Sequence, residues 1–532
     1  MPLRKFAIIL LCGIGLIGAT VGLRAPWLDV SIWNLDEGST MTMGQQMLVG
    51  DVLYRDAVDN RSPLVPYLKA GVFALFGDWS SAAIHVSLAF MLGICALLLG
   101  LMALKLEGRT TAATVAVLFV VLQFVYVDAT DAMCAHTEWF LLIFSTLAFA
   151  GLVLTHEHPS YRAGLPIGLC FSLAMLCKQP GLLDFFVAVI AIAFLAYRFS
   201  DRRRTLLRWV AGMTTAMVLP PLLFLGYYAH HGIVGDFLYY TFTFNTELYV
   251  PEIPLPQRLL TVTKPLEMAW AHAPLIALLA LIGFLTAVPT VIIRTVKSAG
   301  QFPLLALIGL GWTCSALVSS TLGGRGFAHY SITMIPGMCL LAGWIIGRIA
   351  KGNRLPAPAV RWSVVGILAV IAIIQFEQQR QSISGRLAQA DQSLVTHGEI
   401  ARTLTTDEER ILVWGYFPEI YFHARRLPAT RFIYTNYLTG LIPWTNFDPL
   451  TDTSYGVVPD GWTKFEQDFA EQPPALIVDS LLGREYVKYP LAEQTNLWRE
   501  IENAYAEIDL DRGEEPTMRF FRRLEPTSLS PS

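Results

Sequence analysis

Long apolar runs separated by short polar stretches fill the first 376 residues of the chain. A helix needs roughly 20 apolar residues to cross a bilayer. By that measure the pattern predicts about eleven membrane-spanning helices. They lie at approximately 6–24, 80–104, 110–127, 139–155, 163–177, 181–197, 209–229, 267–293, 303–321, 330–347 and 362–376. An odd number of spans places the two termini on opposite sides of the membrane.

The loop between the first two spans, residues 25–79, is too long for a simple turn. Residues 39–48 have mixed helical character, and Ser62-Pro63 predicts an N-cap followed by proline at the first position of a helix that runs through Phe76. We expect two short amphipathic helices that lie on the membrane surface. A second segment, residues 230–266, is rich in Tyr, Phe and Pro and is expected at the membrane interface.

The pattern changes at Glu377, where the long apolar runs end. Residues 375–402 have a polar helical pattern, and short apolar runs at 410–415, 475–479 and 518–521 predict strands. The fold class is therefore mainly α, a polytopic membrane helix bundle followed by a small α/β domain. We expect a transmembrane domain at 1–376 and an α/β domain at 377–532.

Composition agrees with a membrane protein. Of the 532 residues, 54% are hydrophobic and only 15% are charged, and the mean hydropathy of +0.48 excludes an ordinary soluble enzyme of this size. The net charge of -3 gives no indication of a nucleic-acid partner. The seven cysteines lie in or beside apolar segments, so they are interpreted as core residues and not as a disulfide framework.

Basic residues gather in alternate loops, which is typical of the cytoplasmic side. These loops hold Arg4, Lys5, Lys105, Arg109, Arg162, Arg198, Arg202, Arg203, Arg204, Arg208, Arg294, Lys297, Arg348, Lys351, Arg354 and Arg361. The N-terminus is therefore expected in the cytoplasm and the C-terminal domain outside it. The expected location is the plasma membrane, in a bacterium the inner membrane.

The opposite loops combine acids and bases at the depth of the membrane surface. The set comprises Asp36, Glu37, Arg55, Asp59, Arg61, Lys69, Asp128, Asp131, His136, Glu138, Lys178, Arg325 and His329. Charge is costly beside lipid, so such a set indicates an anionic or polar ligand. Asp128 and Asp131 alone are interpreted as solvated loop acids.

Chemistry outside the cytoplasm narrows the ligand, because nucleotide-activated sugars and ATP are absent there. A transferase on that side needs a donor already activated in the membrane, and a polyprenyl-phosphate sugar meets this need. Its phosphate requires Arg or Lys, the acceptor hydroxyl requires a carboxylate to take its proton, and the lipid tail requires an apolar groove.

Five motifs in these loops resemble those of the polytopic GT-C glycosyltransferases, specifically the protein O-mannosyltransferases and lipid A aminoarabinose transferases. The motifs are Leu35-Asp36-Glu37-Gly38, Tyr54-Arg55-Asp56 with Asp59-Asn60-Arg61-Ser62-Pro63-Leu64, His136-Thr137-Glu138, Lys178-Gln179-Pro180 and Gly324-Arg325-Gly326-Phe327-Ala328-His329-Tyr330. The resemblance covers about the first 350 residues, and it rests on the order of the motifs and their common side of the membrane.

The resemblance implies that Asp36 is the catalytic carboxylate, which accepts a proton from the acceptor hydroxyl, and that Glu37 assists it. It also implies that Arg61 neutralises the donor phosphate. The expected donor-phosphate and substrate-binding residues are Arg55, Asp59, Arg61, Glu138, Lys178, Arg325, His329 and Tyr330. Asn60 stands where aminoarabinose transferases carry an acid that helps to bind metal, so no metal ligand is assigned. No cofactor is assigned with certainty, and a divalent cation is left open.

Several of these residues also have structural interpretations. Asp36 and Glu37 could be solvated or stabilise a helix N-terminus. Arg61 and Lys178 could extend toward lipid headgroups, and Glu138 could cap its own span.

The functional prediction is a glycosyltransferase that uses a polyprenyl-phosphate sugar and a glycolipid, glycan or protein acceptor, with inversion at the anomeric carbon. The alternatives are a transporter or flippase of lipid-linked sugars, which would use the same basic residues, and a non-catalytic assembly scaffold. Internal repeats, common in transporters, are not evident.

Overall fold

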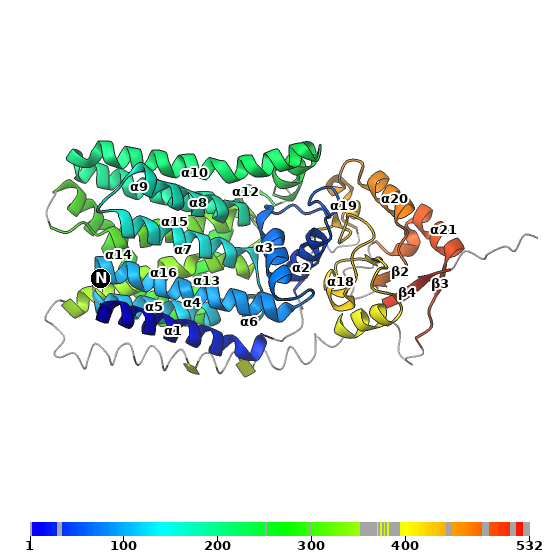
Figure 1. Cartoon of the computed structure of the whole chain (residues 1–532), viewed down its shortest axis with the longest axis horizontal. Coiled ribbons are helices and arrows are strands. Elements are labelled where there is room, and N and C mark those ends of the chain that lie inside the picture. Colours follow the sequence, from blue (N-terminus) through cyan, green and yellow to red (C-terminus); the bar gives the residue numbers. More distant parts are fainter. Residues whose placement is uncertain are drawn as a thin grey trace, which may run out of the picture.

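The computed structural model describes residues 3–28, 34–250, 253–297, 300–351, 394–442, 450–480, 489–510 and 518–524, with isolated positions between 366 and 381. Figure 1 shows a bundle of long helices at one end and a small α/β domain at the other, with helices α2 and α3 between them. The chain begins at the end of the bundle that lies away from the α/β domain.

Ten of the eleven predicted spans coincide with helices of the bundle. These are α1 (Leu3–Arg24), α4 (Ser81–Leu106), α5 (Arg109–Val125), α7 (Thr137–Thr155), α8 (Tyr161–Cys177), α9 (Gly181–Arg198), α10 (Arg203–His230), α14 (Pro274–Val296), α15 (Leu304–Leu322) and α16 (Ile335–Lys351). In the described part of the chain, eight helical segments are long and apolar enough to cross a membrane, whereas α5 and α8 are shorter apolar helices of 17 residues each. Most of the eleventh predicted span, 362–376, lies outside the described residues.

Small residues let α8 and α10 approach closely. A side chain at Gly168 would bring its Cβ within 1.9 Å of the carbonyl oxygen of Met213, and one at Gly164 would come within 2.3 Å of the oxygen of Trp209. Gly164 and Gly168 lie one helical turn apart, which is the small-residue spacing used for helix contacts in membranes. The backbones of these two helices therefore pack directly against each other.

Helix α2 (Leu35–Leu48) begins at Asn34, whose Oδ1 accepts hydrogen bonds from the backbone N–H groups of Asp36 and Glu37 at 2.9 and 3.3 Å. The prediction that this helix lies on the membrane surface is wrong. Residues 37–46 are buried, because α2 packs between α3 and α18 (Glu419–Ala424) of the C-terminal domain. The cover that buries it comes from a segment almost 400 residues away in the chain.

Helix α3 (Leu64–Phe76) confirms the second helix predicted in this loop, although it begins one residue later than expected. Pro63 occupies the N-cap position that was predicted for Ser62. The segment after α10 forms α11 (Val234–Leu238), the π-helix η3 (Tyr239–Tyr249) and α12 (Leu255–Leu260). Within it, Phe244 packs on Tyr437 of the C-terminal domain, with ring centroids 5.2 Å apart.

The C-terminal domain contains a four-stranded sheet in the order β1-β2-β4-β3. Its strands are β1 (Ile411–Trp414), β2 (Leu476–Ser480), β3 (Tyr505–Glu507) and β4 (Met518–Arg523). Strands β1 and β2 are parallel, and β4 runs antiparallel to β2 and β3. The three predicted strands are confirmed, whereas β3 has only three residues and too little pattern to be recognised. Residues 394–403 are helical, as expected for the end of the polar segment.

Candidate active site

Asp36 lies in the first turn of α2, where the N-cap at Asn34 fixes its backbone. Its Oδ1 accepts a hydrogen bond from Nη2 of Arg61, and Nη1 of Arg61 donates to Asp59 Oδ2 at 3.0 Å. Asp59 is buried, whereas the Asp36 side chain remains 30% exposed. The guanidinium of Arg61 thus holds two carboxylates, of which only Asp36 can be reached by a substrate.

Two histidines lie beside Asp36. The rings of His136 and His329 are stacked with centroids 4.4 Å apart, and Nε2 of His329 lies 3.6 Å from Asp36 Oδ2. Asp131 joins both rings, because its Oδ1 is 3.1 Å from Nε2 of His136 and 3.8 Å from Nδ1 of His329. The interpretation of Asp131 as a solvated loop acid is therefore wrong, whereas Asp128 is exposed.

Burial opposes the ionisation of Asp36, but the charges of Arg61, His329 and His136 outweigh it and hold the pKa of this carboxyl well below its ordinary value. Burial alone would lower the pKa of His136, yet its hydrogen bond and charge interaction with Asp131 raise it. Asp36 is consequently ionised at neutral pH and able to accept a proton.

Lys178 and Glu138 form the next part of the cluster. Nζ of Lys178, between α8 and α9, donates to Oε1 of Glu138 at the start of α7, and it lies 3.9 Å from the ring centroid of Tyr330. Glu138 Oε1 is also 4.0 Å from Nε2 of His329. The motifs at 136–138, 178–180 and 324–330 therefore meet at one place.

Arg325 lies at the edge of this cluster. Its Nη2 donates to the carbonyl oxygen of Tyr249 at 2.8 Å, and its guanidinium lies 4.2 Å from the centroid of the Tyr249 ring. Tyr249 ends the π-helix η3 and is in turn close enough to Tyr330 for a side-chain hydrogen bond. Arg325 is thus connected through Tyr249 and Tyr330 to Lys178.

Glu37 points away from Asp36. Its Oε1 lies 2.8 Å from Nε2 of His85 and accepts a hydrogen bond from the backbone N–H of Ala135 at 2.8 Å. Burial opposes its ionisation, but the charge and hydrogen bond of His85 lower the pKa of Glu37 to about 2. Glu37 ties α2 to α4 and to the loop before α7, so it supports the site without facing the reacting groups.

Arg55 is not brought into the cluster. It forms a two-pronged ion pair with the neighbouring Asp56, with Nη2 to Oδ2 at 2.8 Å, and 42% of its side chain is exposed. Asn60 exchanges hydrogen bonds with Asn245 of η3, at 2.9 Å between side chains and 2.7 Å to the Asn60 carbonyl. These contacts fix the loop that carries Arg61.

Asp36, His136 and His329 also form a set that could hold a metal ion. Each offers one ligand atom, and the three atoms all lie within 4.8 Å of one another. Two imidazole nitrogens and one carboxylate oxygen suit a divalent transition-metal ion. No metal ligand was predicted from the sequence, because Asn60 stands where related enzymes carry an acid. The set found in the structure instead uses His136, from the loop before α7.

The C-terminal domain covers the site through Glu419 at the start of α18. A Cβ on Gly38 would lie 2.9 Å from Cγ of Glu419, so α2 and α18 meet at a glycine two residues after Asp36. Glu419 is buried, and its Oε2 has no hydrogen-bond partner among the residues that the structure describes. Burial, reinforced by the charges of Asp36 and Glu37, raises the pKa of Glu419 to about 8.

This raised pKa predicts a loss of stability with increasing pH. Below about pH 4.5 the carboxyl is protonated in both states, and between pH 4.5 and 8 the folded state retains a proton that the unfolded chain releases. The free energy of unfolding should fall across that window, by at most about 5 kcal/mol for a single group. Thermal unfolding of the solubilised protein from pH 5 to 9 measures this loss.

In Glu419→Gln the loss should be largely absent, so the variant should be more stable than the wild type above pH 8. Glu466→Gln, at an exposed acid of the same domain, serves as the control. An unchanged pH dependence in Glu419→Gln would show that Glu419 is not the group responsible.

Asp131 and His136 belong to the ionisable loop residues expected at the membrane surface but were given no role in the site, and Tyr249 and Glu419 were not expected near it. Of these four residues, only His136 lies within a motif that the sequence analysis recognised, His136-Thr137-Glu138. Asp131 precedes it by five residues, but Tyr249 and Glu419 come from segments whose approach to Asp36 depends on the whole fold.

Comparisons with known proteins concern one region of the sequence and the overall fold. Residues 60–225 match the family model described as dolichyl-phosphate-mannose-protein mannosyltransferase. No curated protein sequence matches the chain. The structure of ArnT from Cupriavidus metallidurans bound to undecaprenyl phosphate is 14% identical, with 100% of both chains covered and a TM-score of 0.58. Its apo structure gives a TM-score of 0.60 at 14% identity, covering 97% of this chain and 98% of that one.

A second similar fold is that of AglB, the archaeal oligosaccharyltransferase from Archaeoglobus fulgidus, in complex with an inhibitory peptide and a dolichol-phosphate. The two chains are 13% identical, the match covers 95% of this chain and 73% of the AglB chain, and the TM-score is 0.51. The fold that the motifs implied is confirmed: the chain shares the GT-C fold with ArnT and AglB.

Proposed function

We propose that the protein is a membrane glycosyltransferase that moves a sugar from a polyprenyl-phosphate donor to a hydroxyl of a glycolipid, glycan or protein. The observation that carries the proposal is the position of Asp36, a partly exposed and ionised carboxylate among His329, Arg61 and Lys178 at the boundary of helix bundle and C-terminal domain. The mannosyltransferase-family region and the lipid phosphates bound by the similar structures support it.

In the proposed reaction Asp36 takes the proton of the acceptor hydroxyl as its oxygen attacks the anomeric carbon. The bond between that carbon and the phosphate oxygen breaks, its electron pair stays on the phosphate, and polyprenyl phosphate leaves. Attack from the face opposite the leaving group inverts the configuration. Arg61 orients Asp36, and Lys178 and Arg325 supply positive charge near the leaving phosphate.

Charge balance at the site bears on donor binding. The acids Asp36, Asp59, Asp131 and Glu138 outnumber the permanent cations Arg61, Lys178 and Arg325 before a phosphate arrives. Further positive charge is therefore required, and His136 can provide it when protonated, because Asp131 raises its pKa. A divalent cation held by Asp36, His136 and His329 would, when bound, supply such charge as a Lewis acid.

The proposed setting is the plasma membrane, the inner membrane in a bacterium, with the N-terminus in the cytoplasm and the site outside. The distribution of basic loops supports this orientation. In Figure 1 the N-terminus and the C-terminal domain lie at opposite ends of the bundle, which is compatible with it.

Replacing Lys178 by methionine should weaken donor binding. The change removes the cation beside Tyr330, and we expect the KM for the polyprenyl-phosphate sugar to rise about tenfold while the acceptor KM is unchanged. Initial rates at varied donor concentration measure this effect. Lys264→Met, which removes a lysine paired with the exposed Glu267, is the control and should leave both constants unchanged. An unaltered donor KM in Lys178→Met would contradict the assignment.

Mass spectrometry of envelope glycans and lipids from cells with and without the gene tests the function. The proposal predicts that one class of molecule lacks a single sugar when the gene is absent, and that Asp36→Asn fails to restore it. If the protein were instead a flippase, the alternative considered from the sequence, Asp36→Asn would restore the missing sugar. No change in any glycan or lipid would contradict the proposal.

A further inference from the structure

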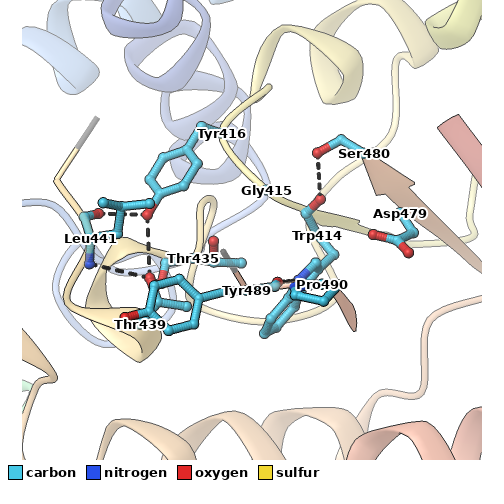
Figure 2. Close-up of a pocket in the computed structure, with 10 residues that line it drawn as sticks. All are labelled: Trp414, Gly415, Tyr416, Thr435, Thr439, Leu441, Asp479, Ser480, Tyr489 and Pro490. Carbon is cyan, nitrogen blue, oxygen red and sulfur yellow. Dashed lines mark hydrogen bonds between the residues drawn. The ribbon is translucent and has the colours of Figure 1, made fainter. Parts of the chain in front are cut away.

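A hollow in the C-terminal domain lies apart from the cluster around Asp36. Figure 2 shows its lining at the carboxyl ends of strands β1 and β2. The lining residues are Trp414, Gly415, Tyr416, Thr435, Thr439, Leu441, Asp479, Ser480, Tyr489 and Pro490. Its cavity volume is about 90 Å³, and the hollow is partly open to solvent, so part of a ligand bound there would remain outside the protein.

The sheet explains why these groups converge. Parallel strands end at the same edge, and Trp414 and Asp479 are register partners at the ends of β1 and β2. After Trp414 the chain turns at Gly415, with φ of +132°, and a side chain there would bring its Cβ within 2.0 Å of Ser480 Oγ. Ser480 Oγ donates to the carbonyl oxygen of Trp414 at 2.8 Å, so the two strand ends are tied together.

The rim of the hollow is fixed by hydrogen bonds. Nε1 of Trp414 donates to the carbonyl oxygen of Tyr489 at 3.0 Å, and the hydroxyl of Tyr416 donates to the carbonyl oxygen of Leu441. The Tyr416 hydroxyl also lies 3.3 Å from Oγ1 of Thr439. The rings of Trp414 and Tyr416 are thereby held in place beside the hollow, as Figure 2 shows, and the hydroxyl of Tyr489 forms a hydrogen bond with Oγ1 of Thr453.

Asp479 is the unusual member of the lining. It is only 2% exposed, and its Oδ1 has no hydrogen-bond partner among the residues that the structure describes. Burial raises its pKa to about 6, with the charge of Arg519 opposing the rise, so Asp479 is ionised above neutral pH. A buried carboxylate oxygen without a donor is costly unless a ligand provides one.

Aromatic faces beside a carboxylate and hydroxyl groups suit a sugar ring, which offers C–H faces for the aromatics and O–H donors for the acid. We propose that this hollow binds a saccharide unit of the acceptor, as a second site distinct from the reaction centre. Saccharide binding is inferred from the residues of the hollow alone, whereas the inference that this saccharide belongs to the acceptor rests on the proposed glycosyltransferase function.

The α19 region connects the two sites. Thr435 and Thr439 line the hollow from the segment that carries α19 (Asn436–Thr439). From the same segment, Tyr434 and Tyr437 lie close enough to Arg61 to interact with it electrostatically. A saccharide bound at this place therefore lies one short helix away from the groups that hold Asp36, which favours the acceptor as its source.

Titration of the full-length solubilised protein with methyl glycosides of a hexose, an N-acetylhexosamine and an amino sugar tests the binding step, followed by tryptophan fluorescence. At least one glycoside should bind saturably, and Asp479→Leu should weaken it at least tenfold. Thr435→Val, a nearly isosteric change in the lining, should weaken it severalfold and remains informative if the leucine variant does not fold. Glu466→Gln, at an exposed acid, should bind as the wild type does.

Two further measurements separate the possible failures. Asp36→Asn should bind the glycoside with unchanged affinity, and Asp479→Leu should unfold at the same or a higher temperature, because it removes an unpartnered buried acid. In transfer assays Asp479→Leu should raise the acceptor KM with kcat unchanged. Saccharide binding without any sugar transfer would contradict the proposed function but would still support the saccharide site. Absence of binding for every glycoside, or unchanged binding in Asp479→Leu and Thr435→Val, would overturn the saccharide site.

Discussion

Asp36→Asn should reduce sugar transfer at least about 10³-fold, the upper part of the range for loss of a general base. The amide cannot accept the proton of the acceptor hydroxyl, whereas its shape and its hydrogen bond from Arg61 are largely preserved. Transfer rates in membranes that contain equal amounts of each protein measure the effect, and binding of the donor should be nearly unchanged.

Asp128→Asn provides the matched control, because Asp128 lies three residues before Asp131 in the chain but is exposed. It should transfer sugar at the wild-type rate. Wild-type activity in a correctly folded Asp36→Asn protein would remove Asp36 from the reaction.

Arg61→Gln should have the second largest effect, a reduction in kcat of about 10²-fold. The side chain positions Asp36 and neutralises the buried Asp59, so the variant should also lose roughly 3 kcal/mol of stability from an unpaired buried acid. Thermal unfolding and kcat, measured on the same preparation, report the two losses.

The double variant Arg61→Gln with Asp59→Asn separates positioning from stability. Removing the charge of Asp59 should restore most of the unfolding temperature while kcat stays low. Recovery of near wild-type kcat in the double variant would show that Arg61 serves the fold alone.

The bundle and the strands could be predicted because their signals are local. Runs of about 20 apolar residues identify spans wherever they occur, and β1, β2 and β4 each carry a short apolar run. The environment of α2 could not be predicted in this way. Its sequence has mixed polarity, and its burial depends on α18, which joins it only in the folded chain.

The candidate site shows the same division. Asp36, Arg61, Glu138, Lys178 and His329 were predicted from motifs, and the fold brings them together. Two other predicted site residues, Glu37 and Arg55, lie close to the site residues in the sequence but do not face the reaction centre. Glu37 follows Asp36, but a helix turns successive side chains about 100° apart, so it faces His85 instead. Arg55 pairs with its own neighbour and stays outside the cluster.

Turnover by the purified protein shows whether Asp36 carries out sugar transfer. The protein in detergent is given a polyprenyl-phosphate hexose and an envelope glycolipid fraction, and free polyprenyl phosphate and glycosylated acceptor are quantified together. We expect equal amounts of both products from the wild type and neither product from Asp36→Asn. Movement of the intact donor across reconstituted vesicles without release of polyprenyl phosphate, or equal turnover by both proteins, would contradict it.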